Sequence, residues 1–573
     1  VFLLSFVAAC TRDSDQRLPI EIVRSVADRL IEDSDFAFEM VPQNEVLGLQ
    51  VLDFESIFCS QTEPAIYYAS GYIIADRDTT ILLGLSYNGK IKIRLNGEVV
   101  YFGNEQKQSL FKEIAYNIIE FQHQINLNLK KGSNHILIKS AATGMPGTVF
   151  LRAMTPEYTE EKSVEFSIGE FAAKIADEKW LYTGPFPLQD NFQQILPPES
   201  QFKPYYLHKG VIYTWKRPAS GTLLRLKKNP ASIFQEKSHV DWRYDNGAAA
   251  WTMFRVAEAT GDQKYFAFLK KYCDFTLENL PYFKWQYEKL HAFRGSYHKY
   301  FRLTMLDDSG GPALPFLYMA INENDKKYTD FLEPIATYVS EHQSRLEDGT
   351  FCRPEPEKMT IWADDLFMSV PFLLGYSKIS GDPKYRNDAV LQVLNFTKYL
   401  YNHEKGIFHH GWYSSSGENS SVFWGRSNGW IIWAVSELLL DMQKKHPDYA
   451  KIITIYRNHV TGLLKYQDKN GSWHQVLDYP SSYEETSCTA MFVMAIARGI
   501  NNGWIGREHE DAALLGWQRL KSKINPDGSI YGTCTGTGMS NSMDFYLTRP
   551  KFDNDPRGIG ATLLAGIEIQ KLN

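Results

Sequence analysis

Two stretches of the chain follow different repeats of hydrophobic and polar positions. From about residue 45 to 205 apolar residues alternate with polar ones, as in 91–95 (IKIRL) and 125–129 (INLNL). A period of two predicts strands with one buried face. Asn96-Gly97 follows the first of these segments, and this pair is typical of a tight hairpin turn because both residues tolerate positive φ. Several short strands at such spacing predict a β-sandwich.

After about residue 240 the repeat becomes that of helices. Ala250, Met253, Phe254 and Ala257 fall at positions i, i+3, i+4 and i+7. This spacing places all four side chains on one face of a helix, so we expect that face to be buried.

The boundary between two helices recurs along this second stretch. ATGDQKY ends at Tyr265, NENDKKY at Tyr328 and SGDPKY at Tyr385, at intervals of 63 and 57 residues. Gly or Asn ends one helix and Asp caps the next. Each interval fits one helical hairpin with its loops, and six such hairpins between 240 and 573 would close into an (α/α)6 barrel. An open solenoid is the alternative, but the large aromatic loops between the hairpins favour closure.

The N-terminal residues indicate where the protein resides. Val1–Ala9 (VFLLSFVAA) is apolar, ends in small residues and precedes a polar segment, as a secretory signal does. The tetrapeptide VAAC resembles a bacterial lipobox, which makes Cys10 the expected lipidated residue; an ordinary cleaved signal is the alternative. We therefore expect a bacterial cell-envelope protein, a periplasmic or outer-membrane lipoprotein, which meets the membrane only through its N-terminal lipid anchor.

Composition narrows the function classes. The chain has 573 residues and a net charge of −6, which argues against a nucleic-acid partner. Its six cysteines include no CxxC pair, so zinc ribbons and redox motifs are excluded. Aromatic residues make up 14% of the chain, and such rings suit the faces of sugars although most fill cores.

Two pairs of acidic residues precede apolar helical segments. Asp307-Asp308 stands before Gly310-Gly311, and Asp364-Asp365 stands within WADDL. Capping of a helix is one explanation for each pair. A barrel, however, gathers equivalent hairpin ends around one pocket, and carboxylates brought close together raise one another's pKa. The two pairs are therefore also candidates for acid–base chemistry.

A second group of polar residues lies between aromatic ones. FHHGW contains His409 and His410, and FWGRSNGW places Arg426 between Trp424 and Trp430. Adjacent histidines diverge, so we expect no metal site and no cofactor here. An arginine beside tryptophans suits a bidentate grip on a carboxylate next to a stacked sugar ring.

Two resemblances follow from these strings. RLNGEVV and LKKGSNHILIK are similar to the galactose-binding-like jelly-roll modules of many glycosidases. Residues from about 235 to 573 resemble the unsaturated rhamnogalacturonyl hydrolases of glycoside hydrolase family 105, which are related to the unsaturated glucuronyl hydrolases of family 88. The strings that carry this second resemblance are, in order, WADDLFMSVPFLLG, FHHGW, FWGRSNGWIIWA, GSWHQVLDYPSSYEETSCTAMF and RPKFDNDPRGIGA.

The family resemblance implies a fold and an activity. It implies an all-α (α/α)6 barrel, here preceded by an all-β, jelly-roll-like sandwich. We accordingly divide the chain into a lipoprotein signal and tether (1–33), a β-sandwich (34–205) and a catalytic barrel (206–573). The implied activity removes a 4,5-unsaturated uronic acid from the non-reducing end of lyase-generated oligosaccharides by hydrating the vinyl ether.

The same resemblance implies roles for particular residues. Asp364 is the expected general acid and base, and Asp308 its acidic partner, with Asp307 as the alternative. His410, Arg426 and Trp430 would hold the uronate, and Trp362 would supply an aromatic wall. Tyr244 either faces the pocket or is structural. A non-catalytic glycan-binding lipoprotein, a polysaccharide lyase and an inverting glycosidase on the same barrel remain alternatives, the last needing carboxylates about 6.5 to 9.5 Å apart.

Overall fold

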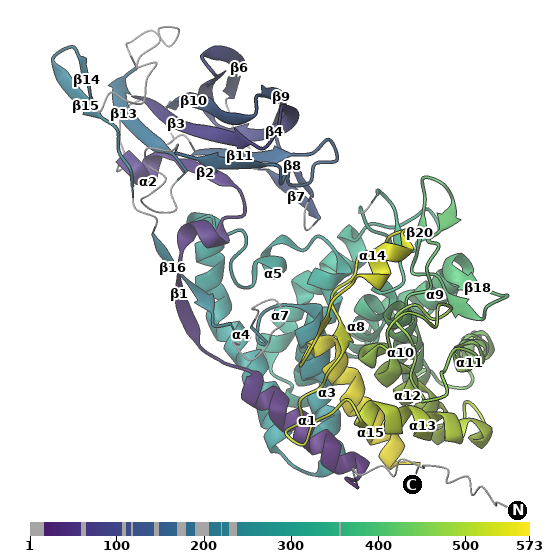
Figure 1. The fold of residues 1–573 in the computed structure, drawn as a ribbon. Coiled ribbons are helices and arrows are strands. Elements are labelled where there is room, and N and C mark those ends of the chain that lie inside the picture. Colours follow the sequence, from purple (N-terminus) through teal and green to yellow (C-terminus); the bar gives the residue numbers. More distant parts are fainter. Residues whose placement is uncertain are drawn as a thin grey trace, which may run out of the picture. The chain divides into compact units, whose positions relative to one another are not determined.

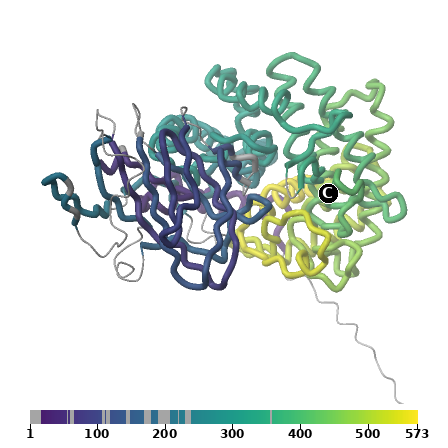
Figure 2. The backbone as a smooth tube through the Cα atoms, turned by 90° about the horizontal axis from the view of Figure 1, so that it is seen from above, coloured from purple at the N-terminus to yellow at the C-terminus, as the bar shows by residue number. Residues whose placement is uncertain are grey.

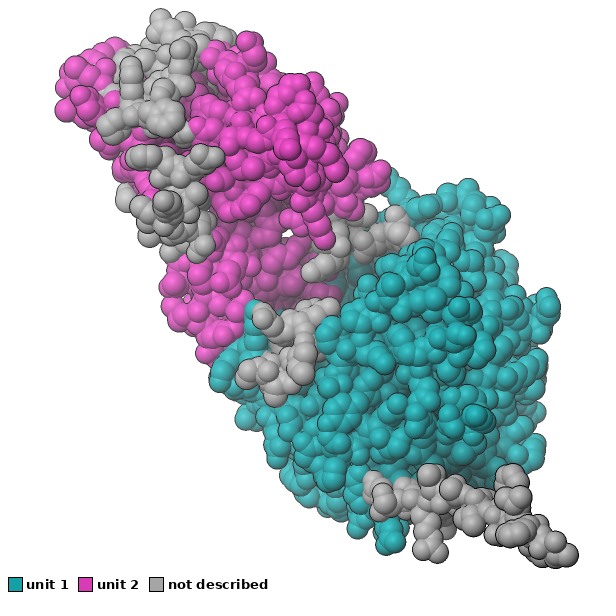
Figure 3. Space-filling view, viewed as in Figure 1, with its two compact units in different colours: residues 1–37, 226–281, 305–573 teal, residues 38–225, 282–304 magenta. Residues whose placement is uncertain are grey.

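A computed structural model describes most of the chain, as two compact units (Figure 3). The described residues are 16–58, 65–105, 111–115, 118–142, 148–168, 179–188, 205–218, 221–228, 238–354 and 357–572. The helical unit comprises the residues up to Ala37, Leu226–Pro281 and those from Met305 onward; the β unit comprises Phe38–Arg225 and Tyr282–Thr304. Cys10, the predicted lipidation site, lies outside the described residues.

Two antiparallel sheets make up most of the β unit. One has six strands, in the order β12-β3-β10-β5-β6 with β13 also on β3, and the other has the order β2-β11-β4-β9. The strands of the first sheet are β3 (Ala65–Ala75), β5 (Gly89–Leu95), β6 (Glu98–Glu105), β10 (Gly132–Ala142), β12 (Val164–Ser167) and β13 (Leu181–Pro187). Those of the second are β2 (Gln50–Asp53), β4 (Thr79–Tyr87), β9 (His123–Leu129) and β11 (Thr148–Met154).

One apolar core joins the two sheets. It contains Ile91, Ile93 and Ile138 from the first sheet and Leu83 and Leu127 from the second, all buried. The predicted alternation is therefore the alternation between core and solvent, and the all-β, sandwich-like first half is confirmed. The predicted hairpin at Asn96-Gly97 is confirmed as well, because both residues have positive φ (51° and 91°) between β5 and β6.

Shorter elements complete the β unit. They are β1 (Phe38–Pro42), which pairs with β16 (Thr222–Leu226), the hairpins β7 (Lys112–Ala115) with β8 (Ile118–Glu120) and β14 (Tyr205–His208) with β15 (Val211–Thr214), and the helices α2 (Phe54–Phe58) and α5 (His298–Arg302).

Six of the described helices form a closed inner ring in the helical unit. Figures 1 and 2 show this helical part of the chain, most of it coloured from teal to yellow. Each helix of the ring packs on the next, and the last packs back on the first, so the barrel is closed and the open solenoid is excluded. In ring order they are α3 (Tyr244–Thr260), α6 (Gly310–Glu323), α8 (Asp365–Ser380), α10 (Gly425–Asp441), α12 (Thr486–Asn501) and α15 (Pro556–Gln570). This arrangement confirms the predicted all-α second half.

The remaining long helices form an outer layer. They are α1 (Pro19–Asp33), α4 (Lys264–Lys289), α7 (Lys326–Thr337), α9 (Pro383–Leu400), α11 (Tyr449–Leu464) and α13 (Glu510–Lys521). The predicted boundaries between hairpins are confirmed: Gly261, Asn324 and Gly381 end their helices with positive φ, and the Asp325 and Asp382 side chains accept hydrogen bonds from the next helices. None of the described helices is long and apolar enough to span a membrane.

Helix α1 differs from the tether that we expected at 1–33. It packs on α15 and α3 and buries Ile22, Val23, Val26 and Leu30, each at most 3% exposed. It thereby fills the outer position beside α15, which no later helix occupies among the described residues. The sixth hairpin of the barrel is therefore completed by a helix from the other end of the chain. The larger segment of the β unit, Phe38–Arg225, is inserted between α1 and α3.

Removing residues 1–33 should therefore destabilise the barrel. Four large apolar side chains would leave the core, each worth about 1.5 to 3 kcal/mol of burial, so we expect a loss of roughly 5 kcal/mol or more. Urea unfolding of the deletion variant measures this loss, and a deletion of residues 1–15, which retains α1, is the control. Equal midpoints for the two variants would contradict the assignment of α1 to the barrel.

Candidate active site

Polar residues gather at one end of the inner ring, where the inner helices begin. Asp364 precedes α8, Arg426 lies in the first turn of α10, Glu485 caps α12, and Asp555 caps α15. An ion pair at 4.0 Å joins two of these positions, Arg426 and Glu485. Helix N-termini bring partial positive charge to this end, which favours acidic groups there.

Asp364 is a partly exposed acid with a buried histidine partner. Its side chain is 13% exposed, whereas that of His410 is fully buried, and Asp364 Oδ2 lies 3.2 Å from His410 Nε2. The other ring nitrogen, His410 Nδ1, lies 2.6 Å from the hydroxyl of Tyr546 in the short helix α14 (Met543–Leu547). Two hydrogen bonds thus fix the imidazole, and the imidazole orients Asp364. Asp364 and His410 were predicted from motifs, but Tyr546 was not.

Arg353 joins the two acidic pairs. Its guanidinium donates to Asp365 at 2.7 and 2.5 Å and to Asp307 at 2.9 and 3.4 Å, and the arginine is only 3% exposed. The same guanidinium lies 4.4 Å from the ring centre of Trp362, the predicted aromatic wall. One buried cation therefore holds the loop before α6, the start of α8 and the Trp362 ring together. No sequence motif marks Arg353, so it was not among the predicted site residues.

The arginine separates the members of each acidic pair. Asp307 and Asp365 are its ion-pair partners, whereas Asp308 is fully buried in the neighbouring 3₁₀ turn and Asp364 bonds His410. Burial raises the pKa of Asp365, and the Arg353 guanidinium opposes that rise. Asp307 is thus held by an ion pair yet is 20% exposed, whereas Asp308 is buried, so the ion pair does not decide which of them is the second acid. Both catalytic assignments stay predictions.

Asn428 holds the short strand Ile407–Phe408, which ends two residues before His410. Its amide oxygen accepts from the Phe408 backbone at 2.8 Å and lies 3.1 Å from His459 Nε2, and its amide nitrogen donates to the Phe408 carbonyl at 2.9 Å. This contact explains why FHHGW and GRSNGW occur together. The two histidines of FHHGW point to different partners, since His409 bonds Ser420.

Because His459 is buried, we expect the folded protein to lose stability in acid. Burial lowers its pKa to about 3 in the folded protein, whereas an unfolded histidine has a pKa of about 6.5. The fold therefore favours the neutral ring, so the stability is complete above about pH 6.5 and falls by up to about 1.4 kcal/mol per pH unit below it. Melting curves from pH 4 to 8 should show a weaker acid dependence for His459→Gln than for exposed His403→Gln. Parallel curves would contradict this.

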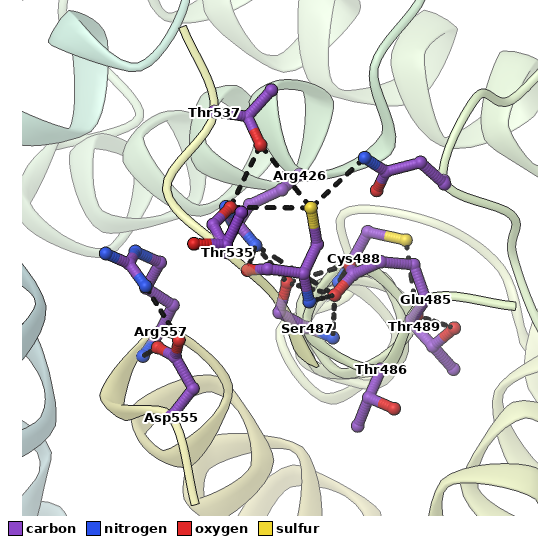
Figure 4. A network of polar contacts seen from close by, with 12 residues as sticks. Arg426, Glu485, Thr486, Ser487, Cys488, Thr489, Thr535, Thr537, Asp555 and Arg557 are labelled. Carbon is purple, nitrogen blue, oxygen red and sulfur yellow. Dashed lines mark hydrogen bonds and ion pairs between the residues drawn. The ribbon is translucent and has the colours of Figure 1, made fainter. Parts of the chain in front are cut away.

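Arg426 is buried among backbone carbonyls (Figure 4). Its Nη1 donates to the Cys534 carbonyl at 2.5 Å and to Ser487 Oγ at 3.3 Å, and its Nη2 donates to the Thr535 carbonyl. Glu485 lies 4.0 Å away and accepts from the Cys534 amide at 2.8 Å. Arg426 thus binds the main chain of a loop, a role that differs from the predicted grip on a uronate. That grip stays a prediction.

A substitution at Arg426 distinguishes binding of the loop main chain from binding of the substrate uronate. With three donor contacts to buried groups, Arg426→Lys should lower the free energy of unfolding by about 2 to 3 kcal/mol, because lysine cannot span two carbonyls. Chemical unfolding measures this, with steady-state kinetics on the same protein. A variant of unchanged stability but raised KM would instead support the predicted uronate contact.

The other residues that were predicted to contact the substrate, Tyr244, Trp430 and Trp362, differ in burial and in their contacts. Tyr244 begins α3, and its hydroxyl accepts from Arg557 Nε at 2.9 Å; burial raises its pKa. Arg557 in turn pairs with Asp555 at 2.7 Å. Trp430 is 1% exposed and packs on Phe367 at 4.6 Å, so it lies within the wall of the ring. Trp362 is partly exposed in β17 (Ile361–Trp362), paired with β20 (Gly411–Tyr413).

Two other features of the described residues bear on the location of the chemistry. No group of three or more His, Cys, Asp or Glu side chains there could hold a metal ion. A cavity of about 320 Å³ lies between the C-terminal halves of α3, α6, α8 and α10, away from the acids. Its three acidic residues are paired, Asp441 with Lys378, Glu437 with Arg498 and Glu258 with Arg255, which makes it a poor catalytic site.

Known proteins share this barrel. The chain is 27% identical over 350 residues to an unsaturated 3S-rhamnoglycuronyl hydrolase of Formosa agariphila, covering 58% of this chain and 85% of the relative. It is 25% identical to an unsaturated rhamnogalacturonyl hydrolase of Bacillus subtilis, covering 57% and 89%. A solved structure from Salmonella enterica, a possible member of family GH105, has a TM-score of 0.51 at 23% identity, covering 59% of this chain and 85% of that one.

A family model gives the assignment. The model described as Glycosyl Hydrolase Family 88 matches residues 222–573, which is more than half of the chain. The predicted resemblance to unsaturated uronyl hydrolases is thereby confirmed. The chain belongs to Glycosyl Hydrolase Family 88 and is a glycoside hydrolase.

Proposed function

We propose that this protein removes a 4,5-unsaturated uronic acid from the non-reducing end of oligosaccharides released by polysaccharide lyases. The observation that carries the proposal is the partly exposed Asp364 carboxylate, bonded to buried His410 at 3.2 Å beside the clamp formed by Arg353. The proposal is further supported by two relatives whose names state hydrolysis of unsaturated rhamnoglycuronyl and rhamnogalacturonyl groups.

The proposed reaction begins at the double bond. Asp364 donates a proton to C4, and water adds its oxygen to C5 while Asp364 takes up a proton from that water. The product is a hemiketal, whose ring opens to a ketone at C5 and leaves a hemiacetal at C1. Collapse of that hemiacetal gives an aldehyde and releases the remaining oligosaccharide as an alcohol. Proton transfer of this kind contributes about 10²- to 10⁴-fold in rate.

Neighbouring residues would orient the reactants. His410, held by Tyr546, fixes the Asp364 carboxylate, and Asp308 is the proposed second acid. Trp362 would form one wall against the sugar ring, since flat aromatic faces suit apolar sugar faces.

An ultraviolet assay tests the proposal. The unsaturated uronate absorbs through its conjugated double bond, so the purified protein should remove the absorbance of lyase-generated oligosaccharides. Saturated oligosaccharides of the same sequence are the control and should stay intact. Appearance of absorbance from an intact polymer would indicate a lyase instead, and binding without any change would indicate a glycan-binding protein.

We also propose that Cys10 is acylated and anchors the protein in the bacterial envelope. The support is the VAAC sequence after an apolar run. One acyl chain binds membranes only marginally, whereas two or three anchor stably. A Cys10→Ser variant that fractionates with membranes like the wild type would contradict this proposal.

A further inference from the structure

Three arginines converge on one short piece of main chain in the helical unit. Arg426 donates to the Cys534 and Thr535 carbonyls, and Arg549 donates from Nη2 to the next carbonyl, that of Gly536. Arg557 lies beside the same glycine, because a Cβ at Gly536 would come within 3.0 Å of Arg557 Nη2. This piece belongs to a glycine-rich segment, 532–542.

The three positive charges are unequally compensated. Arg426 has Glu485 at 4.0 Å, and Arg557 has Asp555 at 2.7 Å and Asp245 at 3.3 Å. Arg549 differs: no described Asp or Glu forms an ion pair with it within 4.0 Å. Burial and the charges of Arg426 and Arg557 lower the pKa of Arg549. An added anion would relieve this repulsion.

Arg549 also has a hydrogen-bond donor to spare. Its Nε is buried and, within the described part of the chain, has no hydrogen-bond acceptor. Buried donors of this kind are nearly always satisfied by protein, water or ligand. The side chain itself is held in place, since Nη2 bonds the Gly536 carbonyl and the guanidinium lies 5.1 Å from the ring centre of Phe545. A fixed guanidinium with an available donor is suited to a planar carboxylate.

The segment that holds Arg549 borders the candidate active site. A Cβ at Gly538 would lie 3.8 Å from Trp362 and 3.9 Å from Phe545, so this glycine fits between the two rings. Tyr546, three residues before Arg549, bonds both His410 and the backbone amide of Ser540. The residues around Arg549 therefore touch the aromatic wall and the histidine that orients Asp364.

We propose that Arg549 binds the carboxylate of the substrate uronate. It supplies the charged contact that we first assigned to Arg426. The Nε of Arg426 also has no acceptor, but Arg426 is only 1% exposed and its Nη groups are engaged by the main chain, whereas Arg549 is partly exposed. This inference rests on the proposed function for the identity of the anion, and it names the residue that makes the protein select a uronate over a neutral sugar.

The test compares an acid with its ester. An unsaturated uronyl disaccharide and its uronate methyl ester differ only in the charge that Arg549 would bind. Arg549→Gln should lower kcat/KM about 10- to 100-fold on the acid, the worth of one charge-assisted contact, and less than about 3-fold on the ester. Arg549→Lys, which keeps the charge but not the fork, should lie between. Arg507→Gln, on an exposed helix end, is the matched control.

Two results would overturn the inference. An equal loss on acid and ester would mean that Arg549 only supports the loop, and unchanged kinetics of folded Arg549→Gln on the acid would mean that it contacts nothing charged. Arg549→Lys decides the matter if the Gln variant fails to fold, since it should lose activity on the acid selectively.

A binding measurement separates this inference from the proposed function. Titration calorimetry with galacturonate and glucuronate, against the neutral parent sugars, needs no turnover. Uronate binding that Arg549→Gln weakens about 10-fold or more, and Arg549→Lys to a smaller extent, supports the inference even if the wild type hydrolyses no unsaturated substrate. That absence of hydrolysis would reject the proposed function alone. Uronate binding of equal strength in the wild type and both variants overturns the inference.

Discussion

Asp364→Asn should leave the helical unit folded and lower kcat by roughly 10²- to 10⁴-fold, as expected for a lost proton donor. The asparagine keeps the size of the side chain and can still hydrogen-bond His410, which lies 3.2 Å from the native carboxylate. It cannot supply a proton to C4. Because the Asp364 side chain makes no cap hydrogen bond to α8, little stability should be lost.

A second aspartate serves as the control for capping. Asp382 precedes α9 and accepts a hydrogen bond from the Lys384 amide at 2.9 Å, away from the acidic pairs. Asp382→Asn should keep full activity, since Asn is also a good N-cap. Near-normal turnover by folded Asp364→Asn would reject Asp364 as the acid.

Arg353→Met should cost about 3 to 5 kcal/mol of unfolding free energy. Its removal leaves two carboxylates without their cation, and one of them, Asp365, is completely buried. Activity should fall as well, because Arg353 holds Asp307, Asp365 and the Trp362 ring in place. Urea unfolding monitored by circular dichroism measures the loss.

Two further variants identify the cause of that loss. Arg507→Met removes an exposed ion pair with Glu510 and should cost less than about 1 kcal/mol. Adding Asp365→Asn to Arg353→Met should recover part of the stability, because the buried charge disappears. No recovery would mean that packing by the arginine, and not charge compensation, is the main contribution.

Most of the fold could be predicted from local patterns. Alternation in 91–95, the Asn96-Gly97 turn and the recurring caps at Gly261 and Gly381 each depend on a few neighbouring residues, and each is confirmed. Helix α1 shows the limit. Its apolar face was visible in the sequence, but only the barrel reveals that it packs on α15, which lies more than 500 residues later.

The residues of the candidate site could be predicted only where they belong to short sequence motifs. Asp364, His410 and Trp362 belong to recognisable strings and do lie together. Arg353 and Tyr546 belong to no motif that we used, and Tyr546 reaches His410 across 136 residues of sequence. Arg426 shows the converse, since its motif was recognised but its partners, the carbonyls of Cys534 and Thr535, could not be foreseen.

Isotope labelling follows the proposed hydration of the double bond itself. The protein is incubated with an unsaturated uronyl disaccharide in heavy water, and the released sugar is analysed by NMR. Hydration predicts one deuterium at C4, the loss of the double bond and a ketone at C5, with this incorporation strongly reduced in Asp364→Asn. A released sugar that retains its double bond and carries no deuterium at C4 would show direct attack at the anomeric carbon and contradict the account.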